Sequence, residues 1–313
     1  MSKIVTLTVN PAIDKSTRTS SIIPEKKLRC QNPQCEPGGG GINVSRAIQK
    51  IGGQSQALLL TGGHSGQFIE DLLKHEQLDY RTIPIAGDTR ENFIVVDSSS
   101  GSQYRFGMEG PSVTPEEAAF CLKVLEETLT DSDYLVASGS LSPGMADDFY
   151  AQVARLAQKA GCRLVLDTSG KALELAANDG VYLLKPNLNE LSRLFGVEEL
   201  QMNEVADAAR KLIGKGYCEV MVVSMGPGGA MLVSASEKYH VTAPVVKKQS
   251  TVGAGDSMVA GLVWSLSQEK DLKTALQYGV ACGTAATMNP GTALCKKEDV
   301  ERLFEWISTH LEK

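Results

Sequence analysis

The residues best suited to phosphate chemistry form the segment Ser250-Thr251-Val252-Gly253-Ala254-Gly255-Asp256-Ser257. An apolar helical pattern, Met258–Leu266, follows it, so the amides of residues 252–256 converge at a predicted helix N-terminus and favour an anion there. A carboxylate in this place repels the anion. Asp256 is therefore either the N-cap of the helix or a general base, placed where a hydroxyl attacks a bound phosphoryl group. The segment favours the general base.

A second glycine-rich segment, Gly38-Gly39-Gly40-Gly41-Ile42-Asn43-Val44, runs into a predicted helix over Ile42–Ile51. Four glycines leave the amides at a helix start unshielded, which suits a small polar or phosphorylated ligand. A flexible turn is the alternative. The spacing is not the G-x-G-x-x-G of dinucleotide-binding folds, and no ribose-binding acid ends the next strand. This disfavours a nucleotide-dependent oxidoreductase.

Two further turns follow predicted strands. In Lys185-Pro186-Asn187-Leu188-Asn189-Glu190, the side chains of Asn187 and Glu190 can hold Mg²⁺ through water, or they can cap the next helix. Ser224-Met225-Gly226-Pro227-Gly228-Gly229 lets backbone approach a nucleotide, or is an ordinary tight turn. The sequence has no Walker A loop, since Gly216 follows Gly214-Lys215 where a hydroxyl is needed, and no serine-hydrolase G-x-S-x-G.

A regular alternation of strands and helices must position these turns. Strands are predicted at Lys3–Val9, Ser55–Leu60, Tyr134–Ser138, Arg163–Asp167, Tyr182–Lys185 and Val220–Ser224, with a hairpin at Ala230–Ser234 and Lys238–Val241. Helices are predicted at Ile42–Ile51, Gly66–His75, Pro115–Leu129, Asp147–Ala160, Lys171–Ala177, Asn189–Phe195, Asn203–Lys215, Asp256–Ser267, Leu272–Met288 and Glu298–Leu311. The alternation predicts an α/β fold with a mostly parallel sheet between two helical layers. The candidate turns then lie at the carboxyl ends of strands, where such sheets bind ligands.

Two stretches interrupt the alternation. Lys15–Gln34 predicts strands without a helix, and Asn92–Asp97 pairs with Ser102–Phe106 across a Ser/Gly turn. These stretches either form a small sheet beside the main body or are separate surface hairpins.

Composition excludes several classes. The 313 residues carry a formal net charge of -6, so an overall basic footprint for nucleic acid or an anionic membrane is missing. No apolar run approaches the ~18 residues of a membrane span. Seven cysteines, an odd number without C-x-x-C, predict reduced thiols in a cytoplasmic protein. The 30 glycines exceed the typical share of about 7%, and several of them lie in the turns above.

Together these segments resemble the PfkB (ribokinase-like) sugar kinase family over nearly the whole chain. Residues 38–44 resemble its first signature, and residues 250–257 match its second, T-x-G-A-G-D. Within the family, the phosphofructokinase and tagatose-6-phosphate kinase branch is most similar, through Asn10–Asp14, Gln103–Phe106, Ser138–Gly144 and Lys185–Glu190. The resemblance implies a three-layer α/β/α ribokinase-like domain over residues 1–313, with β-sheet lid strands inserted at about 15–34 and 88–108.

The resemblance also implies roles for the matching residues. Asp256 takes the proton from a sugar hydroxyl as it attacks the γ-phosphate of ATP, and the transition state is stabilised by the amides of Gly253, Ala254 and Gly255. Mg²⁺ is held by Asn187 and Glu190. The ATP contacts are Lys185, Asn187, Ser224, Gly226 and Gly229. A monovalent cation such as K⁺ is held by carbonyls near Ser250, Val252, Ala286, Asn289 and Gly291.

The implied sugar-phosphate contacts are Asp14, Gly39, Asn43, Ser140, Arg90, Arg105 and Lys27. The arginines bind the phosphate, although without the resemblance they are ordinary solvated charges, and Lys27 adds a contact from its own or a neighbouring subunit. The lid strands are implied to form a homodimer interface. Whether dimers pair into tetramers stays open.

The resemblance also implies one particular substrate within this branch. Fructose-1-phosphate and tagatose-6-phosphate kinases commonly carry lysine where this chain has Gly40, and Glu36-Pro37, Lys27–Cys30 and Asn289–Thr292 resemble the minor PfkB-type bacterial 6-phosphofructokinases. The resemblance therefore implies ATP-dependent phosphorylation of fructose 6-phosphate at its C1 hydroxyl, which gives fructose 1,6-bisphosphate. The other two kinase activities are the alternatives within the family. A non-catalytic sugar-phosphate sensor is the alternative from another class.

Overall fold

The protein, described here over residues 3–310 of a computed structural model, is organised by two sheets. The strands of the larger sheet are β1 (Ile4–Thr8), β4 (Gln56–Thr61), β5 (Tyr80–Pro84), β8 (Tyr134–Ser138), β9 (Arg163–Asp167), β10 (Val181–Leu184), β11 (Cys218–Ser224), β12 (Ala230–Ser234) and β13 (Lys238–Val241). They lie in the order β13-β12-β11-β10-β9-β8-β1-β4-β5. Neighbours from β11 to β5 are parallel, whereas β12 and β13 add an antiparallel hairpin at one edge.

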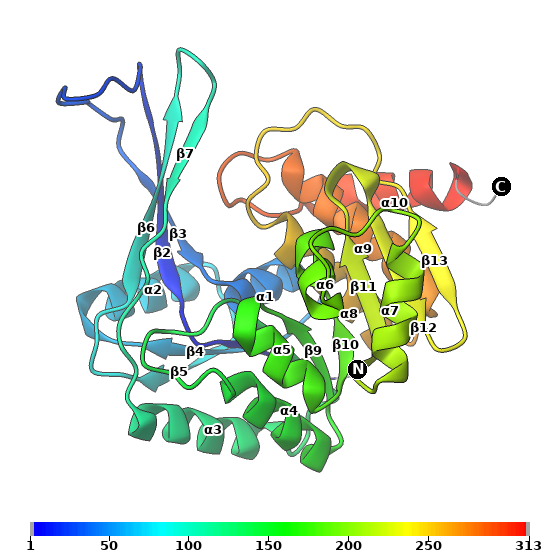
Figure 1. Ribbon diagram of the computed structural model, residues 1–313. Coiled ribbons are helices and arrows are strands. Elements are labelled where there is room, and N and C mark those ends of the chain that lie inside the picture. The colour runs from blue at the N-terminus through cyan, green and yellow to red at the C-terminus, as the bar shows by residue number, and fades with distance from the viewer. Residues whose placement is uncertain (1–2, 311–313) are drawn as a thin grey trace.

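Helices cover both faces of this sheet (Figure 1). The helices are α1 (Gly40–Lys50), α2 (Gly63–His75), α3 (Pro115–Leu129), α4 (Phe149–Ala160), α5 (Gly170–Asn178), α6 (Leu188–Phe195), α7 (Val205–Gly214), α8 (Ala254–Ser267), α9 (Leu272–Thr287) and α10 (Lys297–His310), with a short 3₁₀ turn at Gly226–Gly228. One buried cluster joins the sheet to α3, α4, α5, α6 and α7, and a second joins it to α1, α8, α9 and α10. The predicted α/β/α layers are therefore confirmed.

The smaller sheet confirms that the two irregular stretches pair. Its strands β2 (Ala12–Thr19), β3 (Gln34–Gly38), β6 (Arg90–Asp97) and β7 (Gln103–Phe106) lie in the order β3-β2-β6-β7 and project from the body (Figure 1). The central pair β2 and β6 is parallel, and the outer pairs are antiparallel. In Figure 1 the free ends of this sheet stand well away from the layers, whereas its base meets α1 and α2.

Three sequence predictions need correction. The first concerns residues 15–34, because β2 starts earlier at Ala12, and residues 20–33 are mostly loop with one bridge, Thr19 to Cys30. The second is the missed strand β5, which is an edge strand with only one fully buried apolar residue, Ile83, and a terminal proline. The third concerns helix starts in glycine-containing segments: α8 begins at Ala254 rather than Asp256, α1 at Gly40 rather than Ile42, and α2 at Gly63 rather than Gly66.

Other features agree with the composition. Of the described part of the chain, no helix has the length and apolarity to cross a membrane. All seven cysteines are free, as predicted. The last predicted helix is present as Lys297–His310, and its predicted final residue, Leu311, lies outside the described residues.

Candidate functional site

Asp256 lies in the first turn of α8, but it does not cap the helix. The N-cap is Gly253, whose backbone is left-handed at φ 72°, and no side chain caps this end. The Oδ2 atom of Asp256 instead accepts a hydrogen bond from Nδ2 of Asn43 at 2.9 Å. The capping alternative is therefore wrong, and the carboxylate is held at the helix N-terminus by a side chain from the other glycine-rich segment.

The surroundings of Asp256 change its proton affinity. Burial, together with the negative charge of Asp167, raises the pKa of Asp256 to about 6. The hydrogen bond from Asn43 and the positive charge of Lys185 act in the opposite direction. A carboxylate with a pKa near 6 is ionised at neutral pH and still accepts a proton readily, which is the property that a general base needs.

Lys185 forms an ion pair with a residue that the sequence analysis missed. Its Nζ lies 3.1 Å from Oδ1 of Asp167, the last residue of β9. Burial disfavours the Lys185 ammonium, but Asp167, with smaller effects of Asp256 and Glu190, outweighs burial and raises the pKa of Lys185. A Cβ on Gly255 would be 3.6 Å from this ammonium, so the charge stands beside the amides of the α8 start. A carboxylate ending a predicted strand was the signal for Asp167.

The glycine-rich segment at residues 38–44 is closely packed. A Cβ on Gly38 would overlap the carboxylate of Asp14, and one on Gly40 would overlap Oγ of Ser138. A Cβ on Gly41 would lie 2.5 Å from the Leu7 carbonyl oxygen. Gly39 is the N-cap of α1, with a positive φ of 116°. The flexible-turn alternative is therefore wrong, because the glycines let α1 begin directly against β1 and β8.

Asp14 lies on the same side as this helix start. Its Oδ1 accepts a hydrogen bond from Nδ2 of Asn92 at 2.9 Å. Burial raises the pKa of Asp14, whereas this hydrogen bond and the charge of Arg90 lower it. The carboxylate is held between β2 and β6, and its negative charge contributes to the raised pKa of Asp256.

Arg90 and Arg105 both make contacts that an ordinary solvated arginine lacks. Arg90 donates to the carbonyl oxygens of Met108 at 2.6 Å and Asn10 at 2.9 Å, and its buried Nε has no partner among the described residues. Arg105 is exposed, but its Nη2 donates to Oγ1 of Thr251 at 3.0 Å and to Gln103. Arg105 thus connects the small sheet to the loop before α8.

The Asn187 and Glu190 pair forms the predicted helix cap. Oδ1 of Asn187 accepts from the Glu190 amide at 2.9 Å, and Oε2 of Glu190 accepts from the Asn187 amide at 2.8 Å. Burial raises the pKa of Glu190. Within residues 3–310, no three acidic, cysteine or histidine side chains gather as a metal cluster.

The nucleotide candidates lie beside this cap. The amide of Ser224, at the end of β11, donates to the Pro186 carbonyl oxygen at 2.9 Å, and Ser224 pairs with Asn187. Gly226 has a positive φ of 57° and open space around its Cβ position, whereas a Cβ on Gly229 would collide with the Val241 carbonyl oxygen. Gly226 leaves room for a ligand, and Gly229 is explained by the close approach of β13.

The residues of the implied monovalent-cation site lie around the C-terminal end of α9. The Ser250 amide donates to the Thr287 carbonyl oxygen, and the Val252 amide donates to Oγ of Ser250. The Asn289 amide donates to the Ala286 carbonyl oxygen. Gly291 follows in the loop and lies beside β2 and β3, where a Cβ would be 3.6 Å from Oγ of Ser16. The two implied segments are thus neighbours.

Two of the predicted sugar contacts, Ser140 and Lys27, are less firmly held. Ser140 is exposed, and its Oγ accepts a 3.4 Å hydrogen bond from Nδ2 of Asn10. Lys27 is exposed in the loop between β2 and β3, and in the described part of the chain it has no hydrogen bond or ion pair to another predicted site residue.

The strand ends thus bring together a helix N-terminus suited to an anion, a buried lysine and a carboxylate with a raised pKa. This combination suits phosphoryl transfer to a hydroxyl. The family comparison agrees, because the model of the pfkB family of carbohydrate kinases matches residues 4–299. The chain belongs to this family.

Three relatives show which kinases of the family this chain resembles. The ATP-dependent 6-phosphofructokinase isozyme 2 of Mycobacterium tuberculosis is 42% identical over 97% of this chain and 89% of its own. The protein of the same description from Escherichia coli is 41% identical, over 98% of this chain and 100% of its own. The 1-phosphofructokinase of Bacillus subtilis is 32% identical, over 91% of this chain and 93% of its own.

Solved structures of phosphofructokinase-2 from Escherichia coli superpose on the whole fold. The complex with potassium has a TM-score of 0.95 at 41% identity, and the complex with fructose-6-phosphate has a TM-score of 0.93 at 39% identity. A tetrameric inhibited form has a TM-score of 0.93 at 40% identity. In each case 98% of this chain and 100% of the other chain are covered.

Proposed function

We propose that this protein transfers the γ-phosphoryl group of ATP to the C1 hydroxyl of fructose 6-phosphate, giving fructose 1,6-bisphosphate and ADP. The observation that carries the proposal is the placement of Asp256, a carboxylate with a pKa of about 6 among the amides at the start of α8. The 6-phosphofructokinase relatives at 41–42% identity support the choice of substrate. We expect the enzyme to work in the cytoplasm, since its thiols are free.

Asp256 acts as the general base in this proposal. It takes the proton of the C1 hydroxyl as the hydroxyl oxygen attacks the γ-phosphorus, and the bond from that phosphorus to the β–γ bridging oxygen breaks. The amides of Gly253, Ala254 and Gly255 donate to the phosphoryl oxygens, where negative charge gathers in the transition state. Lys185, kept charged by Asp167, contributes its positive charge to the same phosphates.

The sugar phosphate lies between the small sheet and α1. Asn43 donates to Asp256 through Nδ2, and its buried Oδ1 has no partner among the described residues, so it suits a sugar hydroxyl. The Nε of Arg90 is likewise a buried donor without a described partner and suits a phosphate oxygen. The remaining proposed contacts are Asp14, Gly39, Ser140, Arg105 and Lys27.

Magnesium fits the oxygen atoms of Asn187 and Glu190, which are hard ligands next to Ser224 and Gly226 at the proposed nucleotide site. When bound, the ion neutralises the charge that develops on the β- and γ-phosphates. Asn187 and Glu190 hold each other through the helix cap, which uses Oδ1 of Asn187 and Oε2 of Glu190 and leaves Oε1 of Glu190 outside the cap. Gly229 completes the proposed nucleotide turn.

A monovalent cation is proposed beside the α8 start. The C-terminal end of α9 presents carbonyl oxygens, the negative end of the helix dipole, near Ala286 and Asn289, and Ser250 and Val252 lie against it, with Gly291 next along the chain. The potassium complex of the Escherichia coli protein supports this proposal. A cation there stabilises the turn that carries Gly253.

We propose that the chain is one domain and that the small sheet is its lid. Exposed apolar side chains gather on the strands and loop ends of this sheet: Ile23, Phe93, Tyr104, Phe106 and Met108. Such a concentration of apolar surface favours burial against a second copy of the chain. The tetrameric form of the Escherichia coli protein makes the pairing of dimers a further expectation.

An assay of ADP release distinguishes the alternatives. The purified protein is given fructose 6-phosphate, fructose 1-phosphate or tagatose 6-phosphate with ATP and Mg²⁺, and kcat/KM is compared. We expect the highest value for fructose 6-phosphate. A higher value for either other sugar moves the protein to that kinase activity, and the 1-phosphofructokinase of Bacillus subtilis at 32% identity makes fructose 1-phosphate the nearer rival. Sugar binding without ADP release would make the protein a sensor.

A further inference from the structure

The loop between α9 and α10 holds a leucine in an unusual conformation. Leu294 has a φ of 59°, in the left-handed region that residues other than glycine rarely adopt, and only 1% of its surface is exposed. Its side chain lies against Gly253, since a Cβ on Gly253 would be 2.5 Å from Cδ2 of Leu294. A strained residue persists only where its surroundings hold it. Here the strained leucine touches the N-cap of the anion-binding helix.

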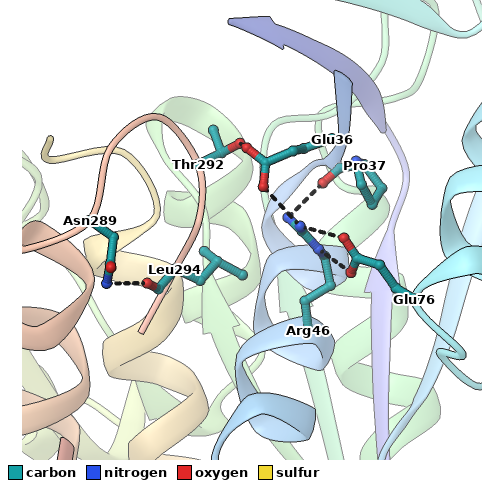
Figure 2. A network of polar contacts seen from close by, with 7 residues as sticks. All are labelled: Glu36, Pro37, Arg46, Glu76, Asn289, Thr292 and Leu294. Carbon is teal, nitrogen blue, oxygen red and sulfur yellow. Dashed lines mark hydrogen bonds and ion pairs between the residues drawn. The ribbon is translucent and has the colours of Figure 1, made fainter. Parts of the chain in front are cut away.

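Two polar contacts hold this loop in place (Figure 2). The Nδ2 of buried Asn289 donates to the Leu294 carbonyl oxygen at 2.9 Å and to the Ala285 carbonyl oxygen at 3.1 Å. The hydroxyl of buried Thr292 donates to Oε2 of Glu36. The first contact ties the loop to the end of α9. The second ties it to the small sheet, because Glu36 belongs to β3.

Glu36 is itself fixed from the other side. Nη2 of Arg46 donates to Oε1 of Glu36 at 3.2 Å, so the Glu36 carboxylate lies between the arginine and Thr292, as Figure 2 shows. On the strand, Glu36 is paired directly with Asp14 of β2. One carboxylate thus connects the strand pair that carries the proposed sugar contact with the loop that presses on Gly253.

We propose that Glu36, Thr292 and Leu294 form a positioning relay between the sugar-binding strand β2 and the amides at the start of α8. The proposal rests on the proposed function, in which those amides receive the transferred phosphoryl group. None of the three residues touches the reacting atoms in this scheme. Glu36 holds Thr292, the loop then holds Leu294 in its left-handed conformation, and Leu294 keeps the turn at Gly253 in the geometry that aims the amides.

The relay explains a feature that packing alone does not. A buried hydroxyl such as that of Thr292 is satisfied equally well by a nearby backbone carbonyl, but here it binds a side chain of the small sheet, 256 positions away. The contact therefore fixes the small sheet relative to the loop. A movement of β3 of a few tenths of an ångström reaches Gly253 through two side chains, and small displacements of catalytic groups reduce rates strongly.

The test compares Thr292→Val with Thr292→Ser. Valine keeps the shape and removes the hydroxyl, whereas serine keeps the hydroxyl. We expect Thr292→Val to lower kcat about tenfold, with a smaller change in KM for ATP. Thr292→Ser should keep most of the wild-type kcat. The matched control is Thr128→Val, which removes a buried hydroxyl that donates to the Val124 carbonyl oxygen and accepts from Arg81, in α3, a helix that packs in a different buried cluster from α8. This control should lose stability and keep its kcat.

Two results would overturn the relay. One is a kcat of Thr292→Val equal to wild type while the melting temperature falls as in Thr128→Val, which assigns the contact to stability alone. The other is full additivity in a double-mutant cycle of Thr292→Val with Leu294→Ala, because residues that act through one path should not add. Asp256→Asn is measured in parallel. Wild-type turnover in that variant removes the base from the proposed function, whereas an inactive Asp256→Asn with an unaffected Thr292→Val removes only the relay.

Discussion

Asn43 and Asp256 are 213 positions apart in the chain and share a 2.9 Å hydrogen bond between Nδ2 and Oδ2. Each residue lies in the first turns of a helix that begins in a glycine-rich segment, α1 for Asn43 and α8 for Asp256. The bond therefore ties together the starts of two helices at the carboxyl edge of the sheet. In the proposed reaction, the other oxygen of this carboxylate, Oδ1, would accept the proton of the substrate hydroxyl.

The first prediction concerns Asp256 itself. Asp256→Asn keeps the size of the side chain and removes the proton acceptor, so we expect kcat to fall at least about 10²-fold while both KM values change little. Steady-state kinetics with fructose 6-phosphate and ATP provides the measurement. Asp271→Asn is the matched control, because Asp271 caps α9 at an exposed position and asparagine caps equally well. Turnover near wild type in Asp256→Asn would falsify the general-base role.

The pH dependence follows from the raised pKa of Asp256. A base must be ionised, so kcat/KM should rise with pH through about 6 and level off above it. The second ionisation of the substrate phosphate also falls near pH 6 and must be separated. Asn43→Ala does this, because the Asn43 hydrogen bond lowers the pKa of Asp256 and the substrate is unchanged. The acidic limb should move to higher pH in Asn43→Ala. An unmoved limb assigns it to the substrate.

The two arginines should respond differently to truncation. Arg105 is exposed and bridges to Thr251, so Arg105→Ala should raise KM for the sugar phosphate about ten- to a hundredfold, and KM for ATP far less, with an unchanged melting temperature. Arg90→Ala also leaves the carbonyl oxygens of Asn10 and Met108 without their donor. It should therefore lower the melting temperature as well. Equal effects of Arg105→Ala on the two KM values argue against a phosphate contact.

Sequence patterns predicted the parts of the fold that local periodicity controls. The central strands are buried on both sides, as β1 with its five buried residues illustrates, and such strands are typical of parallel sheets between helices. The strand β5 lacks that signal because it is half exposed at the sheet edge. The loop within residues 20–33 was predicted as strand because its polar, proline-containing sequence gives no helical pattern either.

Site residues could be predicted where several functional residues lie in one short segment. They could not be predicted where a residue matters through contacts with distant parts of the chain. The glycine-rich segments and Asp256 were found from their own residues. Asp167 was not, since its importance lies in the ion pair with Lys185, which depends on the order of β9 and β10 in the sheet. Arg46 was overlooked for the same reason. Nothing around it in the sequence indicates that it meets Glu76, 30 positions away.

The glycine segment before α1 gives a stability prediction. In Gly40→Ala, the new Cβ would overlap Oγ of Ser138 and lie 2.7 Å from its carbonyl carbon and 2.8 Å from the Gly139 amide nitrogen. Backbone atoms of β8 yield little, so we expect a loss of about 1–3 kcal/mol in the free energy of unfolding. Gly214→Ala is the control, because that position in α7 has open space and alanine favours helix by roughly 0.5–1 kcal/mol. In urea unfolding, Gly40→Ala should have a lower free energy of unfolding than the wild type, and Gly214→Ala a higher one.

The last prediction concerns the buried Arg46, whose bidentate contact with Glu76 has distances of 2.7 and 2.6 Å. Arg46 also donates to the Pro37 carbonyl oxygen at 3.0 Å and to Glu36. Arg46→Met fills the space but leaves two carboxylates facing each other without a cation. Breaking a fully buried pair costs ~3–5 kcal/mol, and we expect about 2–4 kcal/mol here, because Glu76 and Glu36 keep 27% and 23% of their side chains exposed.

Urea unfolding of Arg46→Met should show this loss, with the midpoint lowered and the slope unchanged. Arg81→Met is the matched control, since Arg81 pairs with Glu127 where 47% and 54% of the two side chains are exposed, and an exposed pair contributes little. A triple change, Arg46→Met with Glu36→Gln and Glu76→Gln, should recover part of the stability lost in Arg46→Met, because the unpaired charges are then gone. If the triple variant is less stable still, the cost of Arg46→Met lies in lost hydrogen bonds rather than in uncompensated charge.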